Sequence, residues 1–152
     1  MTLQHIKVIG FDADDTLWVN EPYFRDAEEK FCDLLEGYLP RHTINRELFA
    51  IEIANLPVYG YGIKAFMLSM VEAALKITGN KMPVDIISKI LEIGKTQLDQ
   101  PVEVLEGVED VLQSLTNKYR LVVVTKGDLL KKKKKLTKSG LTKYFHHIEI
   151  VS

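Results

Sequence analysis

Residues 6–17, with the sequence IKVIGFDADDTL, decide the fold of this chain. The first half of this stretch is a short apolar run with bulky residues at alternating positions on both faces. That pattern is typical of a strand buried on both sides in a parallel sheet. Three aspartates, Asp12, Asp14 and Asp15, follow within four residues. Carboxylates this close repel one another unless a cation lies between them. The stretch therefore predicts a buried strand that ends in functional carboxylates.

The spacing of the first two aspartates indicates shared chemistry. Residues two apart in an extended segment project the same way, so Asp12 and Asp14 can address one substrate atom. This arrangement suits a nucleophile and a general acid/base that work on one bond. Mg²⁺ fits as the cation, because its ligands are oxygens and it bridges protein carboxylates and substrate phosphates. The alternative is a polar turn that caps a following helix, which can hold for Asp15 and Thr16 but does not explain the other two carboxylates.

The remaining chain alternates helices with two more apolar runs. Residues 120–125 (RLVVVT) repeat the strand pattern, and residues 147–151 (HIEIV) form a weaker third strand. Strand-helix-strand order predicts a parallel α/β sheet, in which ligands bind beyond the carboxyl ends of the strands. We expect an α/β core from residues 1–18 and 105–152, with an inserted all-helical subdomain over residues 19–104. Helices are expected over 22–36, 44–53, 65–77, 84–98, 107–115 and after Asp128.

Composition excludes several classes of protein. The chain has 152 residues, of which 46% are hydrophobic and 27% are charged, as in soluble globular domains. No apolar run approaches the roughly 18 residues of a membrane-spanning helix, so no membrane association is expected. The single cysteine, Cys32, cannot form an internal disulfide, which predicts a cytoplasmic location.

Charge is distributed unevenly along the chain. Residues 1–117 contain 10 basic and 19 acidic residues, hence a charge of −9, whereas residues 118–152 contain 10 and 2, hence +8. Five of the ten basic residues in 118–152 form the uninterrupted run Lys131–Lys135. Because no aromatic or arginine residue is interleaved with the run, a solvated helix surface is favoured over a nucleic-acid site. Five successive helical positions exceed one turn, so Lys132 or Lys133 is expected to point toward the sheet, where it could snorkel.

The motifs together resemble a known family. The stretch DADDT after an apolar strand resembles the first signature, DxDx[TV], of the haloacid dehalogenase superfamily, and LVVVT, which ends at Thr125, resembles the second. The helical insert resembles the helical cap domain of that family. The resemblance covers nearly the whole chain and implies a Rossmann-like parallel sheet. The third and fourth signatures, a lysine and further acidic metal ligands, do not occur before Ser152. The core is therefore expected to be incomplete at its C-terminus, with the strand of Asp12 at a sheet edge.

The resemblance also implies a role for individual residues. Asp12 would attack a substrate phosphorus, and Asp14 would protonate the leaving alcohol and then activate water. The Asp12 carboxylate and the Asp14 main-chain carbonyl would bind Mg²⁺, and Thr125 would hydrogen-bond the phosphoryl group. Lys126 either neutralises phosphoryl charge or is an exposed loop lysine. A lysine of the run at 131–135 could replace the missing family lysine.

The insert contains a candidate specificity segment. Tyr59, Tyr61 and Lys64 lie beside two glycines between expected helices, and cap loops of the family select the substrate. These residues are candidates for leaving-group recognition, and aromatic packing between helices is the alternative. Trp18 either lines the site or packs in the core.

The sequence thus predicts a cytoplasmic Mg²⁺-dependent phosphatase for a small phosphorylated metabolite. An aspartate at the second motif position favours a phosphatase over a dehalogenase, which needs no acid for its leaving group. The alternatives are a phosphotransferase or phosphomutase of the same family, or a catalytically incomplete protein that binds a phosphorylated ligand or a partner. The sequence gives no indication of the oligomeric state.

Overall fold

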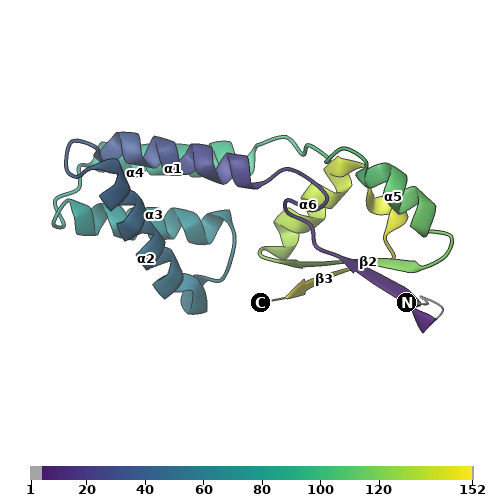
Figure 1. Ribbon diagram of the computed structural model, residues 1–152. Helices are drawn as coiled ribbons and strands as arrows, with labels where there is room; N and C mark the ends of the chain where they lie inside the picture. The colour runs from purple at the N-terminus through teal and green to yellow at the C-terminus, as the bar shows by residue number, and fades with distance from the viewer. Residues whose placement is uncertain (1–4, 152) are drawn as a thin grey trace. The chain divides into compact units, whose positions relative to one another are not determined.

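The computed structural model describes residues 5–151 and divides into two compact units (Figure 1). One unit combines the chain up to Glu21 with the chain from Pro101 onward, and the other contains Pro22–Gln100. The first unit is α/β and the second is entirely helical. No helix in the described part of the chain is long and apolar enough to cross a membrane.

The α/β unit is built on a parallel three-stranded sheet. Its strands are β1 (Val8–Phe11), β2 (Arg120–Lys126) and β3 (His147–Val151), in the order β1-β2-β3. Helices α5 (Val108–Leu115) and α6 (Leu129–Ser139) follow the crossover pattern that the sequence predicts. The predicted α/β class and the edge position of β1 are confirmed.

Strand β1 departs from its expected burial. The sequence predicts that both faces are buried, but Val8 is 51% exposed, and only the face with Ile9 and Phe11 packs on the core. Strand β2, by contrast, has Leu121 and Val123 fully buried. The burial of both faces that the apolar pattern predicts is not found, because the described chain covers only one face of β1, and this agrees with the poor covering expected for a strand at the sheet edge.

The core of the α/β unit fixes the loop after β1. Ala13, Leu17 and Trp18 are buried in the same apolar cluster as residues from β2, α5 and α6. The segments that enter and leave the helical unit also pair here. The Leu105 amide donates to the Leu17 carbonyl at 3.0 Å, and the Val19 amide donates to the Glu103 carbonyl at 2.8 Å. The loop is thus held by apolar packing on one side and by backbone pairing on the other.

The helical unit contains α1 (Glu21–Leu35), α2 (Arg41–Tyr59), α3 (Ile63–Ile77) and α4 (Val84–Leu98). The prediction for α4 is confirmed, whereas α2 extends well beyond the expected 44–53. Pro57 lies in the last turn of α2, where its missing N–H removes a single helical hydrogen bond, so the helix continues to Tyr59.

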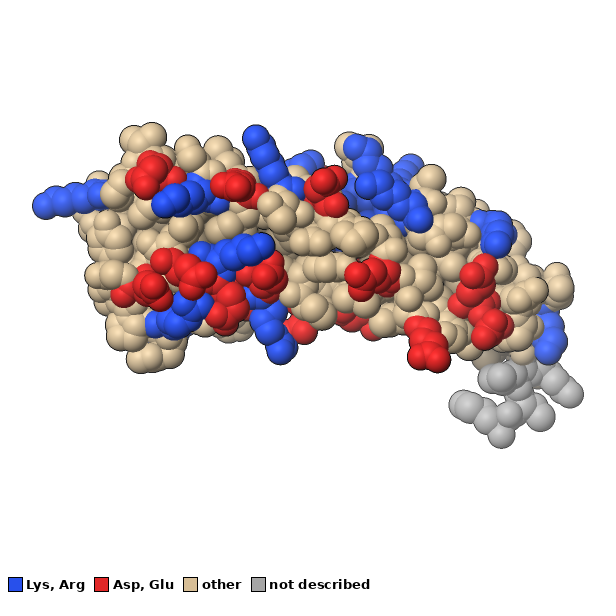
Figure 2. Space-filling view, turned by 90° about the horizontal axis from the view of Figure 1, so that it is seen from above, with Lys and Arg blue, Asp and Glu red and all other residues tan. Residues whose placement is uncertain are grey.

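Apolar packing between the four helices forms the second core. Gly94 lets the Met67 side chain of α3 pack directly on the backbone of α4, since a Cβ at this position would lie 2.1 Å from the Met67 sulfur. Acidic and basic side chains are interspersed on the face drawn in Figure 2. One exposed group joins Arg41 to Glu29, Asp33 and Glu36. The buried core residues are Ala27, Phe31, Cys32, Leu35, Ile44, Leu48, Phe66, Met70, Ala73, Ala74, Ile86, Ile90 and Ile93.

Candidate functional site

The loop after β1 is a tight turn that separates polar from apolar side chains. The amides of Thr16 and Leu17 donate to the Ala13 carbonyl at 3.1 and 2.8 Å, and the Asp15 amide donates to the Trp18 carbonyl at 2.7 Å. Asp15 has a φ of 59°, in the left-handed region that aspartate tolerates better than most residues. With Ala13, Leu17 and Trp18 buried, the intervening carboxylates project from the end of the strand.

Asp15 has a structural task. Its Oδ1 accepts hydrogen bonds from the amides of Asn20 at 2.8 Å and Glu21 at 2.9 Å, at the start of α1. The capping role expected for Asp15 is therefore confirmed. Thr16 belongs to the turn but does not cap the helix, because its hydroxyl donates to Asp12 instead.

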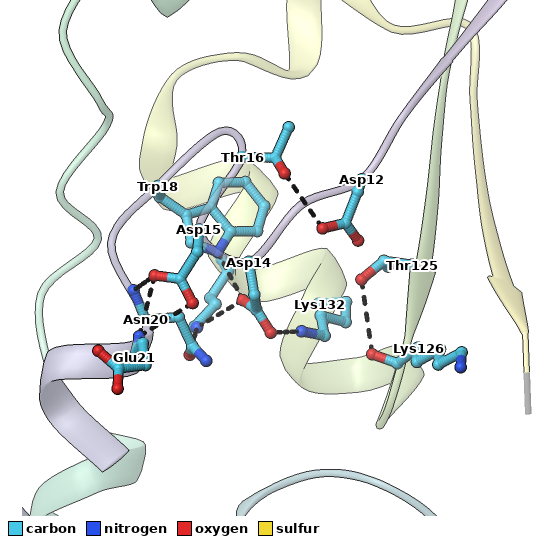
Figure 3. A network of polar contacts seen from close by, with 11 residues as sticks. Asp12, Asp14, Asp15, Thr16, Trp18, Asn20, Glu21, Thr125, Lys126 and Lys132 are labelled. Atoms are coloured by element: carbon cyan, nitrogen blue, oxygen red, sulfur yellow. Dashed lines mark hydrogen bonds and ion pairs between the residues drawn. The ribbon is translucent and has the colours of Figure 1, made fainter. Parts of the chain in front are cut away.

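Asp12 and Thr125 lie at the carboxyl ends of neighbouring strands (Figure 3). Phe11 pairs in parallel register with Val123, which brings the residues that follow each of them to the same sheet edge. Asp12 is exposed, and its Oδ2 accepts a hydrogen bond from Thr16 Oγ1 at 3.1 Å. Thr125 is only 2% exposed, and its hydroxyl donates to the Lys126 carbonyl at 3.5 Å. The exposed carboxylate of Asp12 and the buried hydroxyl of Thr125 thus lie at the same end of the sheet.

Asp14 is held by three donors, one from its own loop and two from α6. Trp18 Nε1 donates to its Oδ1 at 2.8 Å, Lys135 Nζ donates to the same oxygen at 3.1 Å, and Lys132 Nζ forms an ion pair with Oδ2. Burial raises the pKa of Asp14, but Lys132, Lys135 and the Trp18 hydrogen bond outweigh burial, so its pKa lies below the ordinary value. Asp14 is therefore a fixed, ionised carboxylate in this state.

The predicted specificity residues lie together in the helical unit. Tyr59 ends α2, Tyr61 lies between the helices and Lys64 is in the first turn of α3. The Tyr59 hydroxyl donates to Glu72 Oε1 at 2.7 Å, and this hydrogen bond raises the pKa of Tyr59. The expected role of these residues in leaving-group recognition stays a prediction. Lys126, at the end of β2, is exposed.

The residues of the strand end fit Mg²⁺ in part. The exposed carboxylate of Asp12 is a suitable ligand, whereas the carboxylate of Asp14 already contacts two ammonium groups and leaves the main-chain oxygen of that residue as its contribution. Among residues 5–151, no group of three histidine, cysteine or acidic side chains could hold a metal ion. Mg²⁺ bound through one or two protein oxygens normally completes its shell with water and substrate phosphate.

The lysines of α6 are site residues that the sequence only partly indicates. Lys132 is 7% exposed, which confirms that one lysine of the run faces inward. Its partner Asp14 lies 118 residues away in sequence and was not predicted. The signal was the lysine run itself, because a cation on the buried stripe of a helix needs a carboxylate partner, and carboxylates cluster after β1.

Comparisons with known proteins agree with this architecture. A family model described as haloacid dehalogenase-like hydrolase matches residues 6–152. A haloacid dehalogenase-like family hydrolase from Xanthomonas campestris is 42% identical, with a TM-score of 0.90 over 97% of this chain, and the chain spans 62% of that protein. No curated protein matches the chain.

More distant structures share the fold alone. A predicted phosphoglycolate phosphatase from Haemophilus somnus has 19% identity and a TM-score of 0.57, covering 95% of this chain and 62% of its own. A 2-haloacid dehalogenase from Pseudomonas syringae has 20% identity and a TM-score of 0.54, covering 95% and 64%. From its motifs, its fold and these matches, the chain belongs to the haloacid dehalogenase-like hydrolase family.

Proposed function

We propose that this chain carries the catalytic residues of a Mg²⁺-dependent phosphatase that hydrolyses a small phosphomonoester through an aspartyl-phosphate intermediate. The observation that carries the proposal is Asp14, a second carboxylate held in place two residues after the exposed Asp12. A phosphomonoester needs a group that protonates its alkoxide leaving group, whereas a halide leaves as a stable anion. The distant similarity to both phosphatases and dehalogenases does not separate these two reactions, but Asp14 favours the first.

In the first step, an oxygen of Asp12 attacks phosphorus while the bond from phosphorus to the ester oxygen breaks. Asp14 supplies the proton for the leaving oxygen, and the negative charge of a bound phosphomonoester beside Asp14 favours its protonated form. Thr125, at the neighbouring strand end, is the candidate donor to a phosphoryl oxygen. Mg²⁺, when held by the Asp12 carboxylate and the Asp14 main-chain oxygen, would offset the phosphoryl charge.

In the second step, water attacks the phosphorus of the aspartyl-phosphate and Asp14 takes the proton of that water. The bond between phosphorus and the Asp12 oxygen breaks, which releases inorganic phosphate and restores the Asp12 carboxylate. Asp14 has by then given its proton to the leaving oxygen, so it is ionised and can accept the proton of the water. The leaving group would be selected by Tyr59, Tyr61 and Lys64 of the helical unit.

Hydrolysis of 4-nitrophenyl phosphate with Mg²⁺ in ¹⁸O-labelled water tests the proposal. The expected result is one ¹⁸O atom in each released phosphate and loss of turnover with a chelator. Unlabelled phosphate transferred to an added sugar would indicate a phosphotransferase. Chloride release from 2-chloropropionate without phosphatase activity would overturn the proposal in favour of a dehalogenase, and binding of phosphate without any turnover would indicate a catalytically incomplete protein.

A further inference from the structure

Helix α6 directs one of its lysines into the interior of the α/β unit. The Asp128 side chain caps the helix by accepting a hydrogen bond from the Lys131 amide at 3.0 Å, which fixes where the helix begins. From this start, Lys132 and Leu136 lie one turn apart and are both buried, at 7% and 6% exposure. Lys133 and Lys134 are exposed on the other side. The buried Lys132 and the exposed Lys133 and Lys134 therefore have different surroundings although they are adjacent in sequence.

The loop before α6 leaves room for the buried lysine. Gly127 has a φ of 117°, and a Cβ at this position would lie 3.2 Å from Lys132 Cε. The alkyl chain of Lys132 thus passes beside Gly127. This path brings the ammonium group to Oδ2 of Asp14 (Figure 3).

Both oxygens of Asp14 are occupied, and the donors are themselves fixed. Trp18 is fully buried and donates to Oδ1. Lys135 donates to the same oxygen and also to Asn20 Oδ1 at 3.0 Å. A buried ion pair contributes little net stability, because desolvation offsets the attraction between the charges. The net gain in folding stability is thus too small to explain why Lys132 is buried. A fixed orientation of the Asp14 carboxylate, by contrast, would serve its proposed role in proton transfer.

We propose that Lys132 and Lys135 are positioning residues that hold the Asp14 carboxylate in one orientation at the end of β1. The inference rests on the proposed function of Asp14 and adds two residues to it. Orientation of a reacting group before substrate binds lowers the barrier to the chemical step, and small displacements of such a group reduce the rate strongly.

Trp18 provides a spectroscopic test that does not require turnover. It is the only tryptophan of the chain, so its indole N–H gives a single assignable signal in a ¹H–¹⁵N correlation spectrum. Lys132→Met and Lys135→Met should shift this signal, because both alter the carboxylate that accepts the indole hydrogen bond. Lys133→Met is the matched control, with the same change at an exposed neighbour, and should leave the signal in place. An unshifted indole signal in both Lys132→Met and Lys135→Met would overturn the proposal.

Kinetics give the second readout. With 4-nitrophenyl phosphate and Mg²⁺, Lys132→Met should lower kcat by about 10- to 100-fold with little change in KM. Lys132→Arg keeps the positive charge and should therefore retain the wild-type indole signal. Its kcat should lie between those of the wild type and Lys132→Met. If Lys132→Met does not fold, Lys132→Arg still gives both readouts. A raised KM at unchanged kcat would contradict positioning and assign Lys132 to substrate binding.

The two readouts separate failure of this inference from failure of the proposed function. A wild-type chain without turnover contradicts the phosphatase proposal, and the indole signal still decides whether the lysines hold Asp14.

Discussion

The two units of the molecule differ in what they bury. In the helical unit the core is apolar, and its buried polar residues are the neutral Ser69, Thr78 and Gln97. The α/β unit buries a lysine, Lys132, against the carboxylate of Asp14. Desolvation of charges opposes folding, whereas apolar packing favours it. The comparison teaches that apolar packing accounts for the interior of the helical unit, whereas the α/β unit keeps a buried charge pair at the end of β1, where the proposed catalytic residues lie.

The sharpest test of this division separates activity from stability at Asp12. Asp12→Asn should lower phosphate-ester hydrolysis by at least about a thousandfold, because the amide is a poor nucleophile. The midpoint of thermal unfolding should hardly change, since Asp12 is exposed and the hydrogen bond that it accepts comes from Thr16 in the same loop. Phosphate release and circular dichroism measure the two effects. Wild-type turnover in Asp12→Asn would refute the proposed mechanism.

The next largest effect is expected in the apolar core of the helical unit. Phe31→Ala removes a fully buried ring and should lower the free energy of unfolding by about 3–5 kcal/mol. Phe49→Ala is the matched control, because Phe49 is 64% exposed on α2 and its loss should cost far less. Urea titration measures both variants. Equal losses would show that the helical unit does not depend on its buried cluster.

Glu52 of the helical unit is an exception to this contrast between the two units, because its ionisable carboxyl group is half-buried. Burial, with a smaller effect of Glu28, raises the pKa of Glu52 from 4.5 to about 7. The folded state therefore binds this proton more tightly than the unfolded state. The stability that the protonated form confers is complete below about pH 4.5 and is lost as the pH rises through 7. Glu52→Gln, which stays neutral, should thus stabilise the chain by about 1–2 kcal/mol at pH 8 and change little at pH 4.

Glu47 on the same helix is the control with the opposite sign. Its hydrogen bond with Lys76 holds the pKa of Glu47 below the ordinary value, so Glu47→Gln should destabilise the chain at pH 8. Thermal unfolding of both variants at pH 4 and pH 8 measures the difference. A stabilising effect of Glu52→Gln that does not vary with pH would rule out the assigned cause.

The smallest effect is expected for exposed charge pairs. Lys30 and Asp26 form an i,i+4 pair at 2.7 Å on α1, with both side chains about half exposed. Lys30→Met should change the free energy of unfolding by less than about 0.5 kcal/mol, because water and salt screen such pairs. Urea titration at low and high salt measures it. A larger loss would mean that surface charges contribute to the helical unit as strongly as packing.

Much of the fold could be predicted because its signals are local. The apolar periodicity of Val84–Leu98 and the proline before it define α4. The runs of apolar residues in β2 and β3 and their order define a parallel sheet. The residues of β1 by themselves do not predict the exposure of Val8, which depends on the elements that cover the strand and follows instead from the edge position expected for it.

The candidate site could be predicted only where its residues are close in sequence. Asp12 and Asp14 reveal themselves by their spacing after an apolar strand. The pairing of Lys132 and Lys135 with Asp14 depends on the register of α6 against the sheet, which is set by the Asp128 cap and the packing of Leu136. Such a contact arises from tertiary structure, and a single sequence carries no record of it.

The pairing of Leu17 with Leu105 and of Val19 with Glu103 has a consequence for how such enzymes diversify. The two ends of the helical unit leave the α/β unit side by side, as the ends of a tolerated domain insertion do. Because these two ends are adjacent, a different insert could be joined at the same two positions without a change in the path of the Asp12–Trp18 turn. Under the proposed function, in which the helical unit selects the leaving group and the strand-end carboxylates break the bond, exchange of the insert would change specificity while Asp12 and Asp14 stay in place.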